Sequence, residues 1–505
     1  MSNNNSKKIV RNSIILYIRL FFVLIANLYI SRVVLHSLGI YDFGIYNAVG
    51  GFVSLFTVLS SSMSAACSRF LTIELGKGDF KNLKRTFSTS IVIHICLSII
   101  IVLILEPVGF SFINNHMNLT DERLNAANIV FQCSLFTFIM NVISVPYNAS
   151  IISHENMDAY AMISIIETSL KIIIAYIIGI MNVDRLILYA ILLAATSLFI
   201  RCLYGLYCVS KYSECKFRWQ IDKEIVKEMT KFASWNFIGS LSGVSKDQGI
   251  NVLLNIFFGV LINSAYGLAS QVKYAVTNFS NGLLSALNPQ IIKSYSQKNY
   301  EYMMDLIYKG CKFSYFLMLI ISIPLLLNTN FILSLWLGKV PEHTVSFVQL
   351  FIIYILIESY SGPLITGMLA TGKIRNYQLI VGGLQCLTLP ISWLFLKIGY
   401  NAESTFIISI IISIIVLSAR LIMLKKLIPI SITQFINKVI IPTIAISTLT
   451  GLTSVFSFKA SLCSGDFEKL IITTLVSILT NCLFIFLIGT TQSEKKFILN
   501  RIKLK

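Results

Sequence analysis

VPYNASIISHENMDAY, residues 145–160, has a counterpart later in the chain, GPLITGMLATGKIRNY, residues 362–377. The two stretches start 217 positions apart (362 − 145 = 217), Pro146 matches Pro363, and both stretches end in tyrosine. Each contains a short polar turn between two apolar segments. A repeat at this distance predicts that the two halves of the chain are built alike.

A second alignment supports the same repeat. A shift of 220 positions (259 − 39 = 220) places Gly39 on Gly259 and the turn GKGDF (76–80) on SQKNY (296–300). The identities are few, but they coincide with a repeated order of apolar segments and basic loops. We therefore expect two halves in the same orientation, as in transporters built from parallel repeats. The alternative explanation is that an array of similar spans aligns with itself by chance.

The composition is typical of a membrane protein. Of the 505 residues, 55% are hydrophobic and 13% are charged, and the mean hydropathy is +0.76, whereas soluble proteins carry about 25% charged residues. A membrane-spanning helix needs about 20 apolar residues, and the chain offers about fourteen such segments. The expected spans are 13–34, 44–66, 87–106, 126–147, 161–181, 186–208, 232–257, 263–288, 313–334, 346–369, 378–396, 404–424, 439–457 and 470–489.

These spans and the repeat predict the fold class. We expect an all-α polytopic membrane protein of about 14 transmembrane helices, with two parallel six-helix lobes around a central cavity and two further helices. The expected domains are an N-terminal lobe (1–212), a C-terminal lobe (213–436), and a last pair of helices with a basic tail (437–505).

The distribution of basic residues predicts the orientation in the membrane. Of the 41 lysines and arginines, 27 lie in loops on the side that holds both termini, six lie in loops on the other side, and eight lie within or at the edges of spans. This bias predicts that both termini are cytoplasmic. The net charge of +18 is thus a sign of topology, and no nucleic-acid partner is expected.

The stretch GVSKDQGINVLLN (243–255) places charges inside an expected span. Lys246 lies about 20 Å from the cytoplasmic start of that span by helical rise, and Lys273 reaches a similar depth on the next. Because neighbouring residues diverge by about 100° on a helix, we expect Lys246 and Asp247 not to pair with each other. Charges at such depth usually face a bundle interior or an aqueous cavity. The alternative is that one lysine simply neutralises Asp247 or Glu358.

Other charges within spans have less demanding explanations. Arg19 could either enter a cavity or extend to the cytoplasmic surface. Glu167 and Lys171 have the i, i+4 spacing of a structural ion pair. Three arginines close to span ends are expected to extend to the membrane surface: Arg32, Arg201 and Arg420.

Three stretches resemble a known family: LGIYDFGIYNAVGG (38–51), SRFLTIELGKGDFKNLKRTFSTS (68–90) and NASIISHENMDAYAMISIIE (148–167). They are similar to bacterial polysaccharide exporters, the lipid-linked oligosaccharide flippases of O-antigen type in the multidrug, oligosaccharidyl-lipid and polysaccharide exporter (MOP) superfamily. The resemblance implies an inner-membrane protein that moves an undecaprenyl pyrophosphate-linked oligosaccharide by alternating access. The sugar would be a repeat unit of O-antigen, capsule or exopolysaccharide.

The resemblance also implies roles for charged residues. Arg19, Lys246 and Lys273 would supply a cationic cavity for the pyrophosphate, and Asp247 and Glu358 would be coupling or structural acids. Expected partners are membrane lipid, Na⁺ or H⁺ as coupling ion, a polysaccharide polymerase and chain-length proteins. Because the ten cysteines are scattered without a C-x-x-C pair, we expect no metal site, and no cofactor either.

Two alternative functions are weighed against this one. The first is a cation- or proton-coupled drug or metabolite antiporter on the same fold, which would be expected to place acids rather than lysines in its cavity. The second is a membrane-embedded polysaccharide polymerase or glycosyltransferase. Such enzymes usually carry a long outward loop or an acidic metal motif, but here the outward loops reach only about 20 residues and no D-x-D occurs. We therefore expect no enzyme activity and assign no catalytic residue.

Overall fold

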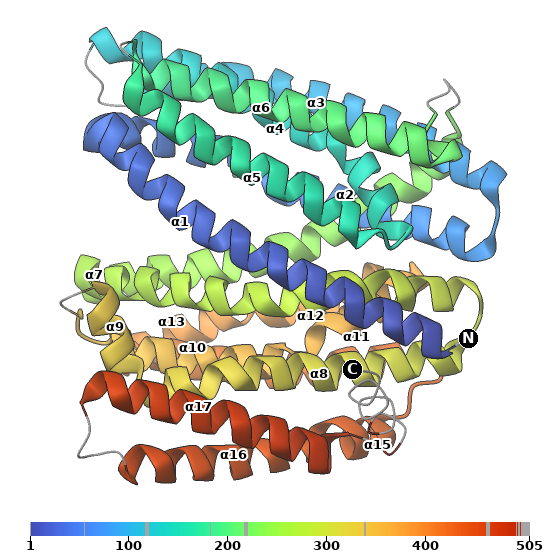
Figure 1. Cartoon of the computed structure of the whole chain (residues 1–505), viewed down its shortest axis with the longest axis vertical. Helices are drawn as coiled ribbons and strands as arrows, with labels where there is room; N and C mark the ends of the chain where they lie inside the picture. Colours follow the sequence, from blue (N-terminus) through green and yellow to red (C-terminus); the bar gives the residue numbers. More distant parts are fainter. Residues whose placement is uncertain are drawn as a thin grey trace. The chain divides into compact units, whose positions relative to one another are not determined.

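The computed structural model describes residues 2–54, 56–116, 121–181, 183–216, 221–337, 340–460 and 465–490, with residues 492 and 495. Throughout these residues the ordered elements are helices (Figure 1). The chain divides into two compact units, Met1–Phe237 (unit 1) and Ile238–Lys505 (unit 2).

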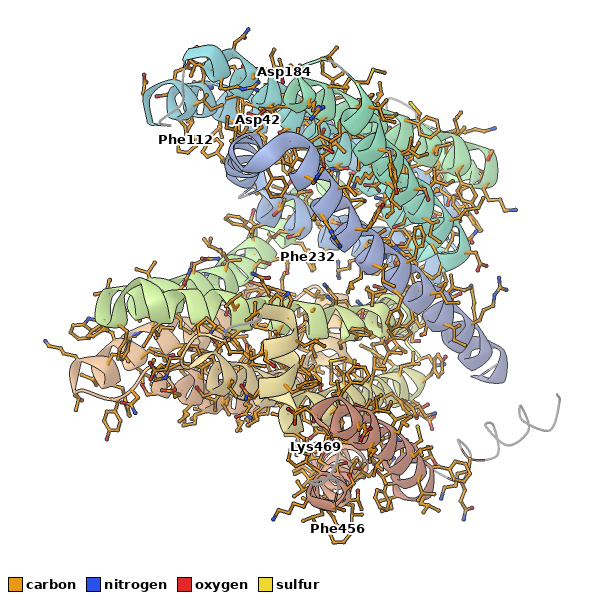
Figure 2. The ribbon with its side chains drawn as sticks, turned by 60° about the vertical axis from the view of Figure 1, so that its left-hand side comes forward. Asp42, Phe112, Asp184, Phe232, Phe456 and Lys469 are labelled. Atoms are coloured by element: carbon orange, nitrogen blue, oxygen red, sulfur yellow. The ribbon has the colours of Figure 1, made fainter. Side chains whose placement is uncertain are left out.

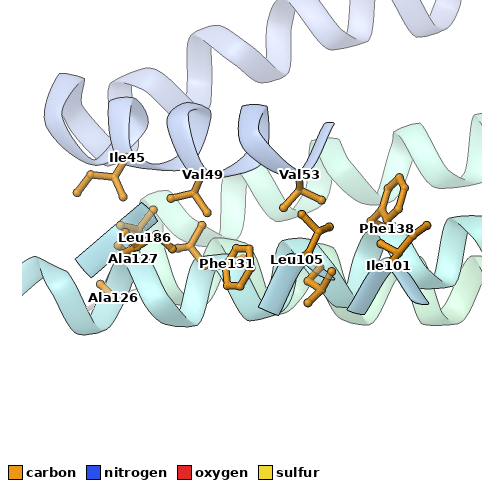
Figure 3. Close-up of a cluster of buried hydrophobic side chains, with 14 of the residues drawn as sticks. Ile45, Val49, Val53, Ile101, Leu105, Ala126, Ala127, Phe131, Phe138 and Leu186 are labelled. Atoms are coloured by element: carbon orange, nitrogen blue, oxygen red, sulfur yellow. The ribbon is translucent and has the colours of Figure 1, made fainter. Parts of the chain in front are cut away.

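Unit 1 is a bundle of long helices that lie side by side. Its elements are α1 (Ser2–Ser54), α2 (Thr57–Lys77), α3 (Phe80–His116), α4 (Asp121–Ser153), α5 (Met157–Ile180), α6 (Arg185–Lys211), the 3-10 turn η1 (Ser213–Cys215) and the start of α7 (Lys223–Ser296). On α1, Ile45, Val49 and Val53 recur every four residues and therefore share one face. Figure 3 shows this face packed towards Leu105 and Phe131 in the buried core.

Unit 2 holds the rest of α7 and the helices that follow it. These are α8 (Tyr300–Leu327), α9 (Thr329–Leu337), α10 (Thr344–Glu358), α11 (Ser361–Thr371), α12 (Arg375–Cys386), α13 (Thr388–Lys397), α14 (Ser404–Lys425), α15 (Ile432–Phe435), the π-helix η2 (Ile436–Ile440), α16 (Ile441–Ala460), α17 (Asp466–Phe484) and the π-helix η3 (Ile485–Gly489). An aromatic cluster forms its core: the Phe406 ring lies 4.5 Å from that of Phe347, 4.8 Å from that of Phe351 and 5.9 Å from that of Tyr266.

The loops expected at 35–43 and 258–262 are not loops. The chain stays helical through both, and each long helix is interrupted at a single glycine, Gly39 (φ 78°, ψ 168°) in α1 and Gly259 (φ 78°, ψ −172°) in α7. Glycine has no Cβ and adopts such positive φ values readily. One residue therefore turns each helix where a longer connection was predicted.

The backbone follows the sequence repeat at other turns. Gly78 (φ 74°) and Lys298 (φ 57°), which are 220 positions apart (298 − 78 = 220), are both in the left-handed region after equivalent helices. Glu155 (φ 59°) and Gly372 (φ 73°) are 217 positions apart (372 − 155 = 217) and behave in the same way. These are the two shifts found in the sequence, so the two halves share their turns as well as their helix order.

Most of the predicted spans are also apolar by a stricter test. Ten described helices are long and apolar enough to cross a membrane, or up to 11 if the pair α10 and α11, bent by 42°, counts as one span. The predicted spans 44–66, 232–257 and 263–288 lie in α1, α2 and α7 and are not among these helices; the first of them is divided between α1 and α2. The predicted fold class, an all-α polytopic membrane protein, is confirmed.

The last two helices are held by hydroxyl and amide groups. Ser477 donates to Ser454 over 2.9 Å, which joins α17 to α16. Asn328 of α8 donates to Thr473 over 2.8 Å. Small polar residues allow helices to approach closely and to hydrogen-bond where no hydrophobic force operates between them. The pair α16 and α17 is thus fixed to α8.

Candidate functional site

The charges of GVSKDQGINVLLN form a cluster inside unit 2. The Nζ atom of Lys273 lies 2.7 Å from Asp247 Oδ2, and that of Lys246 lies 3.5 Å from Asp247 Oδ1. Tyr266 donates its hydroxyl to the backbone oxygen of Asp247 over 3.0 Å. All four residues come from α7, two from each side of the break at Gly259. That break turns the helix back on itself and so brings Lys273 to Asp247.

The expectation that Lys246 and Asp247 could not pair is wrong. Their Cβ directions differ on the helix, but the long lysine side chain bends back until its ammonium group reaches the neighbouring carboxylate. Lys246 is only 7% exposed, so it lies inside unit 2. The ion pair foreseen as the alternative, a lysine neutralising Asp247, is present.

Aromatic side chains of α10 complete the cluster. Lys246 Nζ donates to the hydroxyl of Tyr354 over 2.8 Å, and Lys273 Nζ lies 5.1 Å from the ring centre of Phe351. Ring faces carry partial negative charge and stabilise cations. A small cavity of about 10 Å³ lies among these residues and the α14 residues Phe406 and Ser409. Room of this size accommodates about one water molecule, so this conformation is closed around the lysines.

Glu358 has its own partner. Arg420 of α14 is 3% exposed, lies 2.9 Å from Glu358 Oε1 and also donates to Ser361. The expectation that Arg420 extends to the membrane surface is therefore wrong, because the partly buried Glu358 carboxylate holds it inside the unit. Glu358 also interacts electrostatically with Lys246, so the two ion-pair systems form one network.

The network has a surplus of positive charge. Its cations are Lys246, Lys273 and Arg420, and its carboxylates are Asp247 and Glu358. Three positive charges against two negative charges leave one over within the described residues. An uncompensated charge in an apolar interior is costly, and an anionic ligand would offset that cost.

Arg19 belongs to unit 1, whereas Lys246 and Lys273 belong to unit 2. Its Nε donates to Ser164 Oγ over 2.8 Å, and its guanidinium lies 4.8 Å from the ring centre of Tyr160. It is therefore fixed between α1 and α5. Because the lysines belong to unit 2, a cavity shared by all three cations stays a prediction.

The remaining charges in unit 1 follow the simpler expectations in part. Lys171 lies 2.6 Å from Glu167, which confirms the predicted i, i+4 pair. Arg32 is exposed. Arg201 lies 4.0 Å from the ring centre of Tyr147 on α4, a contact that sequence reasoning missed.

Sequence reasoning also missed the aromatic partners of the lysines. Phe351, Tyr354 and Glu358 are spaced by three and four residues, which places them on one face of α10. That spacing was visible in the sequence and marks a polar and aromatic stripe within an apolar span. Among the described residues, no group of three or more His, Cys, Asp and Glu could hold a metal ion.

Polar contacts also join helix ends in each unit. In unit 1, Arg123 lies 2.9 Å from Asp42 and 2.5 Å from Asp184, and Figure 2 shows the two acids at the same end of the unit. In unit 2, Nδ1 of His343 lies 2.6 Å from Glu403. None of these contacts was predicted from the sequence, because each joins residues that are far apart in the chain.

Solved structures share this fold. A MATE crystal structure in the bent conformation matches with a TM-score of 0.74 at 14% identity, over 84% of this chain and 96% of that one. An outward-facing multidrug resistance MATE family transporter of the MOP superfamily matches with a TM-score of 0.73 at 16% identity, over 84% and 95%. A MOP superfamily transporter from Pyrococcus furiosus matches with a TM-score of 0.69 at 14% identity, over 84% and 95%.

Comparison of the sequence with family models identifies the family. Comparison with curated proteins finds no match. The family model described as "Polysaccharide biosynthesis protein" matches residues 7–295, more than half of the chain. The resemblance carried by residues 38–51, 68–90 and 148–167 falls within that range. The chain therefore belongs to the polysaccharide biosynthesis protein family and has the fold of MOP superfamily transporters.

Proposed function

We propose that this protein is a flippase that carries an undecaprenyl pyrophosphate-linked oligosaccharide across the bacterial inner membrane by alternating access. The observation that carries the proposal is the family match over residues 7–295. The transporter fold and the surplus cation beside Asp247 support it. The repeat unit would belong to O-antigen, capsule or exopolysaccharide.

The chemistry of the cluster suits a diphosphate. A pyrophosphate that leaves water needs cations to compensate its charge, and hydrogen bonds to charged groups are the stronger ones. Lys246 and Lys273 now share Asp247, so a diphosphate could replace that carboxylate as their partner. The cavity of about 10 Å³ has to open for this. Lysine is a compact point charge without the bidentate geometry of arginine, which suits a substrate that has to be released.

The proposal extends to the other expectations. Both termini would be cytoplasmic, Arg19 would add a cation from unit 1, and Asp247 or Glu358 would couple transport to Na⁺ or H⁺. The chain would work in three parts, residues 1–212, 213–436 and 437–505. A polymerase and chain-length proteins would use the delivered repeat unit, and the protein itself would perform no chemical reaction.

Flipping by purified protein in liposomes tests the proposal. A lipid diphosphate oligosaccharide with a fluorescent sugar is placed in both leaflets, and its exposure to an outside quencher is followed over time. We expect Lys246→Ala and Lys273→Ala each to slow flipping about 10- to 100-fold, since a charged hydrogen bond contributes roughly 1.5–3 kcal/mol.

Lys171→Ala provides the matched control, because Lys171 is also a lysine in a span and lies 2.6 Å from a carboxylate. It should flip at the parental rate. If wild-type protein moves no lipid diphosphate sugar, the proposed function is wrong. If Lys246→Ala and Lys273→Ala both flip normally, the role of the lysines is wrong while the function stands.

A drug antiporter is the second candidate, and the fold likeness to multidrug MATE transporters favours it. The Pyrococcus furiosus structure carries a name stating that reverse polarity of its binding pocket suggests a different function. In this chain the surplus of cations likewise argues against a lipophilic cation as substrate. The same liposomes separate the candidates: an antiporter would accumulate a fluorescent organic cation against a proton or sodium gradient and leave the sugar lipid in place.

A further inference from the structure

The repeat places two polar contacts at equivalent positions. Arg123 corresponds to His343 at the shift of 220 positions (343 − 123 = 220), and Asp184 and Glu403 are matched as the N-caps of α6 and α14 (403 − 184 = 219). Each basic residue contacts its acid, over 2.5 Å in unit 1 and 2.6 Å in unit 2. We call these contacts the arginine clasp and the histidine clasp.

Each clasp joins the starts of two helices. Asp184 is the N-cap of α6 and Glu403 is the N-cap of α14, which are equivalent helices. Arg123 lies in the first turn of α4, and His343 is the N-cap of α10. The arginine clasp therefore fixes the start of α4 to the start of α6, and the histidine clasp fixes α10 to α14.

The clasps differ in how they respond to protons. Arginine is charged at every pH at which proteins work, whereas histidine side chains ordinarily change charge near neutral pH. The arginine clasp also has a second acid, Asp42, while the equivalent position in unit 2 is Ile262 (262 − 42 = 220). Among the described residues, Glu403 is the acid that His343 contacts, and it also accepts a hydrogen bond from Ser346 over 2.9 Å.

Few other charges bear on the histidine clasp. Among the described neighbours, Glu342 is adjacent in the chain and exposed, while Lys397 lies over the ring of Trp393 at the end of α13. Tyr400 precedes Glu403 in its loop and packs on Phe395. The titratable groups of α10 and α14 lie at least ten residues along their helices from the clasp, about 15 Å by helical rise or more. On α7, Tyr266 packs on Phe351 and Phe406. Neither α9 nor α11 carries a titratable side chain.

Burial raises the pKa of Glu403, but hydrogen bonds from His343, from its own backbone and from Ser346 outweigh that effect and leave the pKa below its ordinary value. The carboxylate therefore stays charged near neutral pH. Whether the contact is an ion pair therefore depends on the charge of His343.

We propose that His343 is a proton-binding site that sets how tightly α10 is held to α14. With His343 protonated, the clasp is an ion pair; once the proton leaves, at most a hydrogen bond from the neutral ring is left. The clasp lies on the side with few basic loops, which the proposed orientation places outside the cell. α10 carries Phe351 and Tyr354, so the proton would act on the helix whose aromatic side chains contact Lys246 and Lys273. That link to transport rests on the proposed function, whereas the clasp itself does not.

Hydrogen–deuterium exchange on the purified wild-type protein tests the clasp without substrate. Between about pH 5.5 and about pH 8, protection of the first turns of α10 and α14 should fall relative to the first turns of α4 and α6. The expected change is about two- to fivefold, the size of a partly exposed ion pair. The arginine clasp is the internal control, since both sets of amides are measured in one molecule after correction for intrinsic rates. Equal profiles in the two units would overturn the proposal.

Two substitutions exchange the behaviour of the clasps. His343→Arg should remove the pH dependence from unit 2, and Arg123→His should introduce one into unit 1. If the wild-type protein shows the dependence and His343→Arg keeps it, another group binds the proton and the assignment to His343 is wrong. Flipping activity enters neither measurement, so failure of the proposed function and failure of this proposal are distinguishable.

Discussion

At the scale of single residues, Asp247 compensates the positive charge of two lysines in the interior of unit 2. It is the acid that Lys246 and Lys273 share, and without it two ammonium groups would face each other across a cavity of about 10 Å³. Removing one partner from a buried ion pair leaves an uncompensated charge, which is generally more damaging than never having had the pair.

Asp247→Asn should therefore destabilise the protein by about 3–5 kcal/mol. The measurement is thermal unfolding in detergent, followed by the loss of monodisperse protein. Asp305→Asn is the matched control, because Asp305 also pairs with a lysine, Lys309, but at a partly exposed site on α8. Its cost should stay below about 1 kcal/mol. Equal losses in the two variants would show that the interior network is not strained by its charge.

In unit 1, Glu214 of η1 makes the stability of the protein depend on pH in the acid range. Burial raises the pKa of Glu214, but hydrogen bonds from His154 and the backbone outweigh this and leave the pKa below its ordinary value of 4.5. The stability that ionised Glu214 contributes is present above about pH 4.5 and is lost as pH falls through its lowered pKa. The stability difference between wild type and Glu214→Gln should therefore shrink below about pH 4.5. A difference that stays constant down to about pH 3 would contradict this linkage.

Sequence reasoning located the lysines but not their partners. The depth of Lys246 and Lys273 followed from helical rise, and the shared acid was weighed as an alternative. The position of Tyr354 relative to Lys246 depends on how α10 packs on α7, which no local pattern specifies. Arg420 was misplaced for the same reason: its distance from a span end says nothing about Glu358 on another helix.

At the scale of elements, α1 and α7 each turn at one glycine. Gly39 and Gly259 share their backbone conformation, and a Cβ added at either would meet nothing within 4 Å. The requirement for glycine is therefore one of backbone conformation alone. Hydropathy cannot distinguish a loop from a helix with one break, and residues 258–262 (FGVLI) are themselves apolar.

Gly259→Ala should destabilise the protein by about 1–3 kcal/mol, since non-glycine residues are strained at this φ and ψ. Gly267→Ala is the matched control in the same helix, because Gly267 is helical and a Cβ there also meets nothing within 4 Å. That control should be neutral or slightly stabilising, by up to about 1 kcal/mol. Thermal unfolding of both variants measures the difference. If Gly259→Ala is as stable as Gly267→Ala, the break does not depend on glycine.

At the scale of the whole molecule, the repeat was the most informative feature of the sequence. Its two shifts predicted the paired turns at Gly78 and Lys298 and at Glu155 and Gly372, because turns are constrained by the helices that they join. It could not predict the clasps from residue identity, since arginine and histidine differ at the equivalent positions 123 and 343.

The proposed orientation predicts which loops a reagent outside the cell can reach. Single cysteines at Lys81 and Lys298, both exposed, should resist a membrane-impermeant thiol reagent added to intact spheroplasts, because the proposed orientation places them in the cytoplasm. Cysteines at Asn115 and Lys459, also exposed, should react. The native exposed cysteines, such as Cys96 and Cys202, are first replaced by serine. The opposite labelling pattern would reverse the orientation.

The hydroxyl contacts of the last two helices bear on how the protein is made. The hydrogen bonds from Ser477 to Ser454 and from Asn328 to Thr473 form only when α16 and α17 have both been synthesised and have met each other and α8. Before α17 is present, the Asn328 amide keeps only its hydrogen bond to the Pro324 carbonyl. Nascent chains should therefore acquire resistance to membrane proteases late, after α17 leaves the ribosome.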